Sequence, residues 1–480
     1  METAAPLMLF NSLTRTLEPF VPLHDGEARV YTCGPTVYNY PHIGNMRAYV
    51  FADTLGRVLS YKGYKLTHVI NITDVGHLTD DADAGEDKME KMAAEKAQSI
   101  WDIARHYTEA YWADVKALNI RQPAHWSIAT DYVPQMIEFA KSIADTHCYL
   151  LDSGLYFDTS TVANYGALAR ARTDGGEGRI EEVAGKRHAA DFAIWRKTPP
   201  GEIRQMEWDS PWGRGAPGWH LECSVMSEAL LGLPFDIHTG GIDHREIHHP
   251  NEIAQNQARC HSDHSGARYW MHNSWVTAAG QKMGKSLGNA LAVDEVLKQV
   301  RPVELRYHLA AAHYRSTIEF SYESVVESAV GFRRIAAFLE KHAGPPLPPA
   351  QASACPPAFV VAMDDDLGVP AAVAVIFDTV RAGNAATDDV TIRMAWEQVS
   401  AMCSVLGINP LEEPWVDAGG DDRAVSALDA LVADQLAARQ QARADKDWAQ
   451  ADAIRDRLAA AGVQIADSAD GPTWSLRDGG

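Results

Sequence analysis

Residues 31–45, Y-T-C-G-P-T-V-Y-N-Y-P-H-I-G-N, decide the predicted fold because they join a β-prone segment to a helical one. Ala28–Thr32 is short and β-prone, whereas Met46–Lys62 has apolar residues at helical spacing. Leu66–Ile72 is then typical of a second strand. A strand, a crossover helix and a second strand form a parallel unit. Because ligands bind beyond the carboxyl ends of such strands, we expect a nucleotide site along this stretch.

At 480 residues the chain is too long to fold around one ordinary hydrophobic core, so about three domains are predicted. Hydrophobic residues make up 46% of the chain, and no run reaches the roughly 18 apolar residues that a membrane span needs. The first ten residues lack the basic region and the cleavage site of a secretory signal. We therefore expect a cytoplasmic protein that does not bind membranes.

The net charge argues against an indiscriminate nucleic-acid-binding protein, and the cysteine distribution argues against a disulfide-stabilised one. The 43 basic and 64 acidic residues give a net charge of −21, which argues against indiscriminate nucleic-acid binding but leaves room for a local basic surface. The six cysteines are widely scattered, so we expect reduced thiols or metal ligands rather than a disulfide framework.

The rest of the chain divides by its pattern. Pro123–Pro217 has short β-prone pieces and a Gly/Glu-rich stretch, which is typical of an insertion between two halves of a sheet. Two strand-like segments follow, separated by a helix that Pro250 is expected to open at its first position. From Ser321 onward the pattern is nearly all helical, and a last segment begins near Gly419.

We predict an α/β fold in which a Rossmann-like parallel-sheet catalytic domain carries an inserted domain and is followed by an α-helical bundle and a small C-terminal segment. The predicted boundaries are 1–320 for the first domain, with the insertion at about 120–217 and a lysine-loop region at about 277–320, then 321–415 and 416–480.

The first motif that carries chemistry is His42-Ile43-Gly44-Asn45, at the expected start of a helix. A helix N-terminus favours anions, so His42 and Asn45 could donate hydrogen bonds to a nucleotide's phosphates. Gly44 would let the ligand approach the backbone. A histidine at a helix start is also often a cap or a packing group, and this alternative stays open.

The second motif, A-G-Q-K-M-G-K-S-L-G-N, places Lys282 and Lys285 among glycines. Two ammonium groups on a glycine-rich loop are suited to neutralising a triphosphate during attack at its α-phosphorus. Either lysine alone is explained as well by a basic surface turn. The two motifs in one chain indicate adenylate formation.

A third constellation combines two cysteines, a histidine and a glutamate. Cys33 lies beside the first motif, Cys223 follows W-H-L-E, and His248 and Glu252 belong to H-H-P-N-E. If Pro250 opens the helix, Glu252 is its third residue and can face the same point as a histidine just before the helix. These are acceptable zinc donors, although the chain has no C-x-x-C pair there. A buried cysteine is also often an inert apolar group.

Taken in order, the motifs resemble those of cysteinyl-tRNA synthetases, which are class I aminoacyl-tRNA synthetases. The matching strings are C-G-P-T-V-Y-N-Y-P-H-I-G-N, N-I-T-D, P-G-W-H-L-E-C-S, F-D-I-H-T-G-G-I-D, H-H-P-N-E-I-A-Q, K-M-G-K-S-L-G-N, M-D-D-D and D-K-D-W-A-Q-A-D-A-I-R-D. The chain departs from the class pattern at Asn45, where a second histidine is usual, and at Gly284, where serine is commoner. Neither change removes an essential charge.

The resemblance implies that L-cysteine reacts with ATP to give cysteinyl-adenylate, and that the acyl group then passes to the 3′ end of tRNA(Cys). It implies Mg²⁺ with ATP and one Zn²⁺ per chain that binds the sulfur of the substrate, held by Cys33, Cys223, His248 and Glu252. The choice of His248 over His249 depends on the family's spacing.

The same resemblance assigns the remaining site residues. ATP is expected to contact His42, Gly44, Asn45, Lys282 and Lys285, of which all but the glycine are assigned to catalysis. Substrate cysteine is expected to contact Gly34, Thr73, Trp219, His238 and Asp243. Trp219 has the alternative of an ordinary core residue.

For tRNA, the resemblance assigns the insertion to the acceptor end, the bundle to the elbow or stem, and the last segment to the anticodon. Candidates for base contacts are Trp474, Arg439, Arg443, Arg455 and Arg457. Each arginine alone is explained as well by a solvated helix surface. A monomer is the favoured oligomeric state.

Two other functions match part of the pattern. A ligase that joins cysteine to an amino-sugar shares the zinc and nucleotide motifs but lacks a segment such as Lys446–Trp474. A non-catalytic zinc-containing RNA-binding paralogue would not need His42 or the two lysines. Cysteine-dependent exchange of pyrophosphate into ATP, followed by transfer to tRNA, separates the three.

Overall fold

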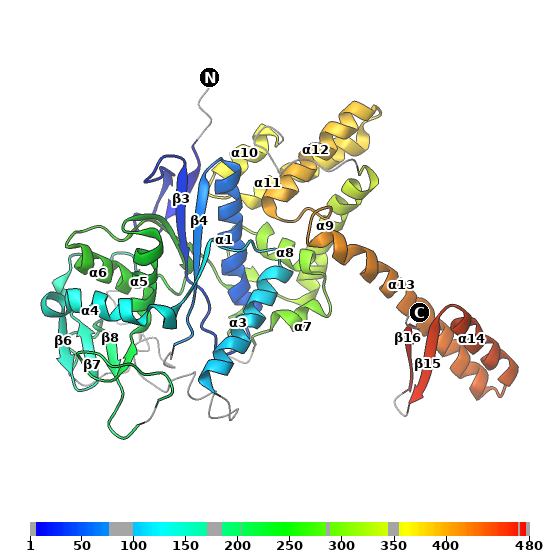
Figure 1. The fold of residues 1–480 in the computed structure, drawn as a ribbon. Helices are drawn as coiled ribbons and strands as arrows, with labels where there is room; N and C mark the ends of the chain where they lie inside the picture. Colours follow the sequence, from blue (N-terminus) through cyan, green and yellow to red (C-terminus); the bar gives the residue numbers. More distant parts are fainter. Residues whose placement is uncertain are drawn as a thin grey trace. The chain divides into compact units, whose positions relative to one another are not determined.

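Five parallel strands form the central sheet of the computed structural model, in the order β11-β10-β3-β4-β5 (Figure 1). They are β3 (Glu27–Thr32), β4 (Lys65–Ile72), β5 (His125–Ile128), β10 (Phe235–Gly241) and β11 (Ala267–Asn273). The chain runs from β3 to β4 and β5, and later returns to the other edge of β3 at β10. Such a reversal of strand order leaves a crevice outside the carboxyl ends of the strands.

The structure describes residues 6–75, 99–169, 185–202, 204–284, 289–343, 355–468 and 471–476, with the backbone alone described at 417–430, 464–468 and 471–476. Among these residues, no helix is long and apolar enough to cross a membrane. The chain divides into two compact units, Met1–Asn409 and Pro410–Gly480.

Helices cover both faces of the central sheet. α1 (Ile43–Tyr61) contacts β3, β4 and β10, and α5 (Trp219–Leu231) contacts β3 and β4. Figure 1 shows α1 on one side of these strands and α5 with α6 (His248–Cys260) on the other. Both layers have an apolar core, which includes Val50 of α1 and Leu221 of α5. The parallel unit predicted from residues 28–72 is confirmed by the pairing of β3 with β4.

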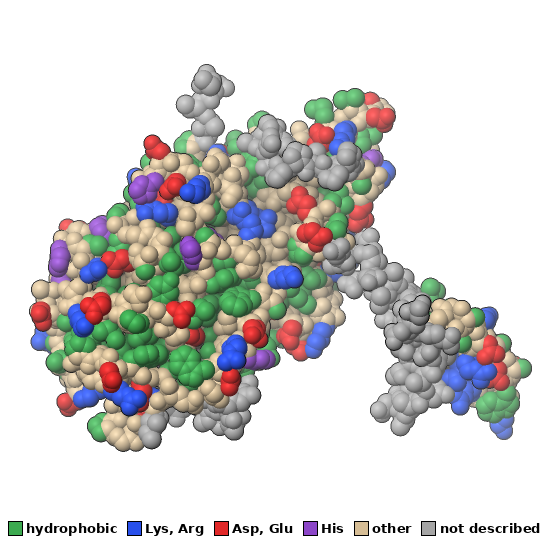
Figure 2. Space-filling model, in the orientation of Figure 1, with side chains coloured by type: hydrophobic (Ala, Val, Ile, Leu, Met, Phe, Trp, Pro, Cys, Tyr) green, Lys and Arg blue, Asp and Glu red, His purple; other side chains and the backbone are tan. Residues whose placement is uncertain are grey.

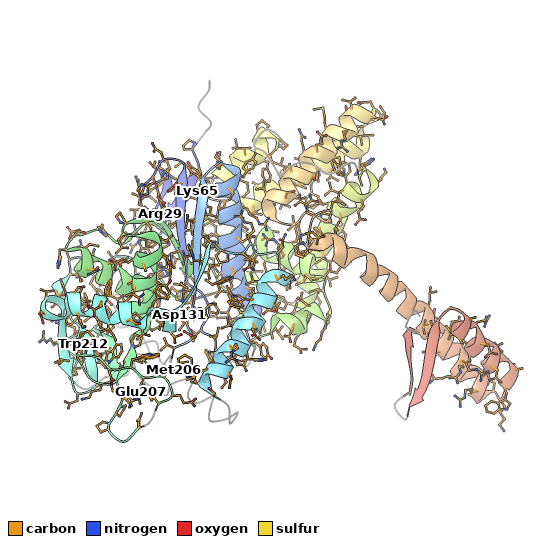
Figure 3. The ribbon with its side chains drawn as sticks, in the orientation of Figure 1. Arg29, Lys65, Asp131, Met206, Glu207 and Trp212 are labelled. Atoms are coloured by element: carbon orange, nitrogen blue, oxygen red, sulfur yellow. The ribbon has the colours of Figure 1, made fainter. Side chains whose placement is uncertain are left out.

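The two ends of the central sheet are marked by labelled side chains in Figure 3. Arg29 in β3 and Lys65 at the start of β4 lie toward one end of the sheet, and Asp131 just after β5 lies toward the other. The carboxyl termini of the strands lie at the end that Asp131 marks. The predicted site residues that follow β3 and β10 lie at this end.

An inserted segment separates the two halves of the sheet. It contains α4 (Val133–His147) and an antiparallel sheet whose strands are β6 (Cys148–Leu151), β7 (Gly154–Phe157), β8 (Phe192–Lys197) and β9 (Gly215–Pro217), with the short 3-10 helices η1 (Ala129–Tyr132) and η2 (Thr159–Thr161). The sequence predicts this insertion at about 120–217. Within that range, β5 pairs with β4 and belongs to the central sheet.

A small sheet of order β13-β12-β14 follows β11 and carries Lys282. Its strands are β12 (Val276–Ala278), β13 (Gln281–Lys282) and β14 (Ile318–Glu319). The same unit also contains the strands β1 (Met8–Asn11) and β2 (Thr16–Pro19) and the helices α3 (Ile100–Ala117), α7 (Val293–Leu297) and α8 (Pro302–Ala311).

The predicted helical region is confirmed by α9 (Tyr322–Lys341), α10 (Pro357–Asp364), α11 (Val369–Ala385) and α12 (Asp389–Leu406). The M-D-D-D string joins this bundle to the end of α1 and to β1. Asp364 accepts the Lys62 ammonium at 2.8 Å, and Asp366 accepts the N–H of Phe10 at 2.8 Å. These acidic residues therefore hold the bundle in place.

The second unit contains α13 (Trp415–Ala444), α14 (Trp448–Ala460) and a hairpin of β15 (Val463–Ser468) and β16 (Gly471–Leu476). A small apolar core forms around Val432, Ile454 and Leu458. The last segment was predicted to begin near Gly419, but this residue lies inside the continuous helix α13.

Charged side chains do not form one basic patch on the face shown in Figure 2. Acidic and basic groups are interspersed there with apolar side chains.

Candidate functional site

The candidate site begins where β3 and β10 end side by side. Thr32, the last residue of β3, has its hydroxyl oxygen 2.7 Å from that of Thr239 in β10. The N–H of Cys33 then donates to the Thr239 carbonyl at 3.1 Å. These bonds fix the first predicted metal ligand at the carboxyl edge of the sheet.

The structure brings all four predicted metal ligands together. The ligand atoms of Cys33, Cys223, His248 and Glu252, which we call the Cys33 cluster, lie within 4.8 Å of one another and are buried. The two sulfurs are 4.0 Å apart, and His248 Nε2 is 3.4 Å from Cys223 Sγ. Glu252 Oε1 has no hydrogen-bond partner among the described residues. The donors, and this buried oxygen without a hydrogen bond, make the cluster compatible with a metal ion.

A second combination of donors overlaps the first. Cys33 and Glu252 also lie within 4.8 Å of His238 and His249. His249 Nε2 is 3.3 Å from Cys33 Sγ, and His238 Nε2 is 2.9 Å from Glu252 Oε2. His248 and His249 therefore both point a ring nitrogen at the cluster.

The position of Pro250 in α6 differs from the prediction. The helix begins at His248, so Pro250 is its third residue and not its first. Proline is tolerated there because the first N–H groups of a helix have no intrahelical partner. As a result, His248 and Glu252 are four residues apart within one helix and share a face, with 3.2 Å between Nε2 and Oε1.

Two further histidines, which sequence reasoning missed, contact the rings at the cluster. His220 Nδ1 is 2.9 Å from His248 Nδ1, and His272 Nε2 is 2.8 Å from His249 Nδ1. Such partners determine which nitrogen of a ligating histidine carries the proton. The only sequence signal was that His220 lies in the same string as Cys223.

Burial dominates the acid–base behaviour of the cluster. It raises the pKa of the Cys33 thiol well above its ordinary value, and Cys223 and Glu252 add to the shift. A thiolate there needs a compensating cation, and a metal ion that binds it would displace the thiol proton.

Thr73 lies in a polar contact set beside the cluster. Its hydroxyl donates to Glu222 Oε2 at 2.9 Å and accepts from the Asn71 amide at 3.2 Å. Burial raises the pKa of Glu222 to about 8, against the opposing effect of the Thr73 hydrogen bond. Glu222 and Asn71 were not predicted, although they belong to the strings W-H-L-E-C and N-I-T-D.

Gly34 lies where the chain passes closest to β4. Its N–H donates to Asn71 Oδ1 at 2.7 Å, and a Cβ added to it would meet the Asn71 carbonyl oxygen at 1.5 Å. Only glycine therefore allows this approach of the two backbones.

The predicted ATP residues of the first motif lie at the start of α1. His42 is the N-cap residue of α1, and the Asn45 side chain accepts the backbone N–H of His42 at 3.1 Å. The Ile43 N–H donates to the Leu291 carbonyl at 3.0 Å, so the start of α1 also touches the chain just beyond the lysine loop.

Lys282 reaches toward the predicted amino-acid site. Its ammonium is 3.1 Å from Asp243 Oδ2 and 5.2 Å from the centre of the Trp275 ring. Met283 beside it is buried. Lys285 lies outside the described residues.

Trp219 and His238 are close to the cluster. The Trp219 ring centre is 4.4 Å from that of His248, and Trp219 is only partly buried. His238 is fully buried and stacks on Trp270 at 4.6 Å. Trp219 therefore lies at the site and not in the interior of the core.

Three family models match successive parts of the chain. Residues 19–330 match the class I (C) tRNA synthetase catalytic domain, residues 358–411 the DALR domain, and residues 426–474 the anticodon binding domain of cysteinyl-tRNA ligase.

Two relatives align over nearly the whole chain. The cysteine–tRNA ligase of Novosphingobium aromaticivorans is 60% identical over 476 residues, which cover 97% of this chain and 96% of that protein. The cysteine–tRNA ligase of Zymomonas mobilis is 44% identical, with 99% of this chain and 98% of that protein covered.

Solved structures of lower identity share the fold. Mycobacterium tuberculosis methionyl-tRNA synthetase in complex with methionyl-adenylate has a TM-score of 0.54 at 14% identity, covering 80% of this chain and 90% of that chain. A leucyl-tRNA synthetase in a ternary complex from Agrobacterium radiobacter has a TM-score of 0.53 at 11% identity, covering 84% and 87%. The predicted α/β fold with a Rossmann-like sheet is thereby confirmed.

Proposed function

Because the chain belongs to the cysteinyl-tRNA synthetase family, we propose that the Cys33 cluster holds one zinc ion that selects substrate cysteine by its thiolate. The chain itself is an enzyme that joins L-cysteine to tRNA(Cys) with ATP, in the two steps of adenylate formation and transfer. The single observation that carries the zinc proposal is the convergence of two thiols, an imidazole and a carboxylate at one buried point.

The distances in the Cys33 cluster are compatible with zinc. Two zinc–sulfur bonds of about 2.3 Å each can span the 4.0 Å between the sulfurs of Cys33 and Cys223. His248 would supply a nitrogen, and Glu252 Oε1, which forms no hydrogen bond with the described residues, would supply an oxygen. We prefer His248 to His249 as the zinc ligand, because the group of donors that contains His248 includes both cysteine sulfurs, whereas the group that contains His249 includes only that of Cys33.

Bound zinc would supply a thiolate-binding Lewis acid that a serine hydroxyl satisfies poorly, and this makes a separate editing site unnecessary. Four protein ligands normally close a zinc site. Glu252 is the candidate for the weak ligand, because its Oε2 is held by His238 at 2.9 Å and can keep the side chain in place.

The amino-acid pocket is proposed to hold the substrate's polar groups beside this cluster. The Thr73 hydroxyl donates a hydrogen bond to Glu222 and accepts one from Asn71, so one lone pair of its oxygen is left to accept a hydrogen bond from the substrate ammonium. Asp243 adds a carboxylate for the same group. Gly34, Trp219 and His238 would surround the substrate.

ATP is proposed to bind across the start of α1 and the lysine loop. His42 and Asn45 would face the phosphates at the helix N-terminus, and Gly44 would let them approach. Lys282 and Lys285 would neutralise the charge that develops during attack, together with Mg²⁺ bound to ATP.

The predicted division of labour on tRNA is also part of the proposal. The insertion would contact the acceptor end, residues 321–415 the elbow or stem, and residues 416–480 the anticodon. The enzyme would act in the cytoplasm and as a monomer. Arg455 is already paired with Asp452 and Asp456, which favours the solvated-surface alternative for that arginine.

The amino-sugar ligase is disfavoured by the anticodon-domain match at residues 426–474. The test is cysteine-dependent ATP–pyrophosphate exchange with the zinc content determined, followed by transfer to tRNA(Cys). Cys33→Ser should lower zinc content and cysteine affinity together, with Cys403→Ser, a buried cysteine of the bundle, as the control. Unchanged zinc stoichiometry in Cys33→Ser would contradict the proposed ligand set.

A further inference from the structure

Arg47, in the second turn of α1, is a buried arginine without an acidic partner in the described part of the chain. Its side chain belongs to a residue that is 1% exposed, and its hydrogen bonds go to main-chain carbonyls. Burying a guanidinium is costly unless its donors are used. The position of these carbonyls therefore indicates what the arginine holds.

The carbonyls flank the small sheet that carries Lys282. Arg47 donates at 3.0 Å to the oxygen of Trp275, the residue just before β12. It also donates at 3.0 Å to His313 and makes a short bond to Ser316, both in the turn before β14. Because β12 lies between β13 and β14, Arg47 fixes both approaches to the sheet on α1.

The chain just after the lysine loop also contacts the start of α1. The Ile43 N–H donates to the Leu291 carbonyl at 3.0 Å, and His42 forms an antiparallel bridge with Ala292. Between these anchors, Met283 is 2% exposed, and its Cβ lies 3.6 Å from a Cβ built on Gly44. His42 and the first five residues of α1 thus contact the chain at Trp275 and Met283 on one side of the lysine loop and at Leu291 and Ala292 on the other.

We infer that Arg47 is a positioning residue for adenylate formation, which sets the distance between the start of α1 and Lys282. The inference rests on the proposed roles of His42 and Lys282 at the phosphates. A lysine at position 47 keeps the charge but lacks the planar fork that reaches several carbonyls at once. Displacement of a reacting group by about 1 Å can cost about 100-fold in rate.

The test is Arg47→Lys in the full-length, zinc-loaded enzyme. We expect the kcat of ATP–pyrophosphate exchange to fall about 10- to 100-fold, with a raised KM for ATP and unchanged zinc content and cysteine affinity. Arg306→Lys is the matched control. Like Arg47, Arg306 is fully buried and donates to main-chain carbonyls, those of Leu118 and Leu406, but it also pairs with Asp53 and lies away from the proposed ATP residues, so Arg306→Lys should lower thermal stability without this kinetic split.

Met283→Ala provides a second variant, should Arg47→Lys not fold. It loosens the same segment from α1 and is expected to give the same selective loss of kcat. If kcat is normal in both variants, or if cysteine affinity falls in parallel with kcat, Arg47 is only structural and the inference is wrong. Absence of exchange in the wild-type enzyme would instead overturn the proposed function and the inference together.

Discussion

The Lys282 ammonium lies 3.1 Å from the Asp243 carboxylate, so a residue assigned to ATP and a residue assigned to cysteine form an ion pair. Both side chains are about half exposed, at 44% and 52%. Such pairs contribute only about 0.2–1 kcal/mol to stability. The contact is therefore expected to matter for substrate binding and not for folding.

Asp243→Asn should raise the KM for cysteine, and Lys282→Ala should raise the KM for ATP, both without a change in melting temperature. Because either substitution breaks the same pair, the double variant should lose less transition-state stabilisation than the sum of the single losses. Exchange kinetics on the three variants measure this. Strict additivity would mean that the pair has no functional coupling.

The Thr73 hydroxyl connects Glu222 with Asn71, and Thr73→Val removes both bonds. A buried polar group left without a partner costs about 1–3 kcal/mol, so stability should fall by that order. The KM for cysteine should rise while zinc content stays constant. The matched control is Thr108→Val, since Thr108 is a buried threonine in α3 that donates to the Ala104 carbonyl. An equal rise in KM in both variants would contradict the role of Thr73.

The choice between His248 and His249 is tested by zinc affinity. His248→Gln should remove a ligand and lower zinc content sharply. His249→Gln should retain zinc at an affinity reduced by about 10- to 100-fold, as expected for a group that supports ligands. If His249→Gln instead lost more zinc than His248→Gln, the metal would be assigned to the second combination of donors, which contains Cys33, His238, His249 and Glu252.

Asp53 in α1 is the centre of a buried ion network with Arg57, Arg306 and Arg121. Burial alone would raise the pKa of Asp53, but the three arginines hold it well below its usual range. A carboxyl of this kind stabilises the fold above its unfolded-state pKa of about 3.9, and the contribution is lost as the pH falls toward the folded-state value.

Asp53→Asn should therefore lower the free energy of unfolding by about 3–5 kcal/mol at neutral pH, because it leaves Arg306 buried without its carboxylate. The difference from wild type should be constant between about pH 5 and pH 8 and should narrow below about pH 4. Denaturant unfolding at several pH values measures it. Asp102→Asn, in an exposed pair with Arg105, should have almost no effect. A difference that widens in acid would contradict the network.

Much of the site could be predicted because short segments of sequence determine it. Cys33 follows a strand, His42 begins a helix, and both follow from local periodicity around residues 31–45. The meeting of Cys33 with Cys223 is a long-range contact. The residues suggested this grouping as a set of possible zinc donors, and the resemblance of whole motifs then implied it as the ligand set.

Other features depend on tertiary contacts that no local pattern reports. The start of α6 was misplaced because proline is tolerated through the first turn, so Pro250 does not mark the first residue. The hydrogen bond between Thr73 and Glu222 joins β4's end to α5, and Arg47 reaches carbonyls more than 220 positions away. These partners become visible only in the folded chain.

The most direct test of the central claim compares cysteine and serine in ATP–pyrophosphate exchange with the zinc-loaded, the chelator-treated and the zinc-restored enzyme. The account predicts exchange with cysteine at an efficiency about 10⁴-fold or more above that with serine, loss of this activity on zinc removal, and recovery on zinc addition. Undiminished selection of cysteine by a folded enzyme free of zinc would contradict it.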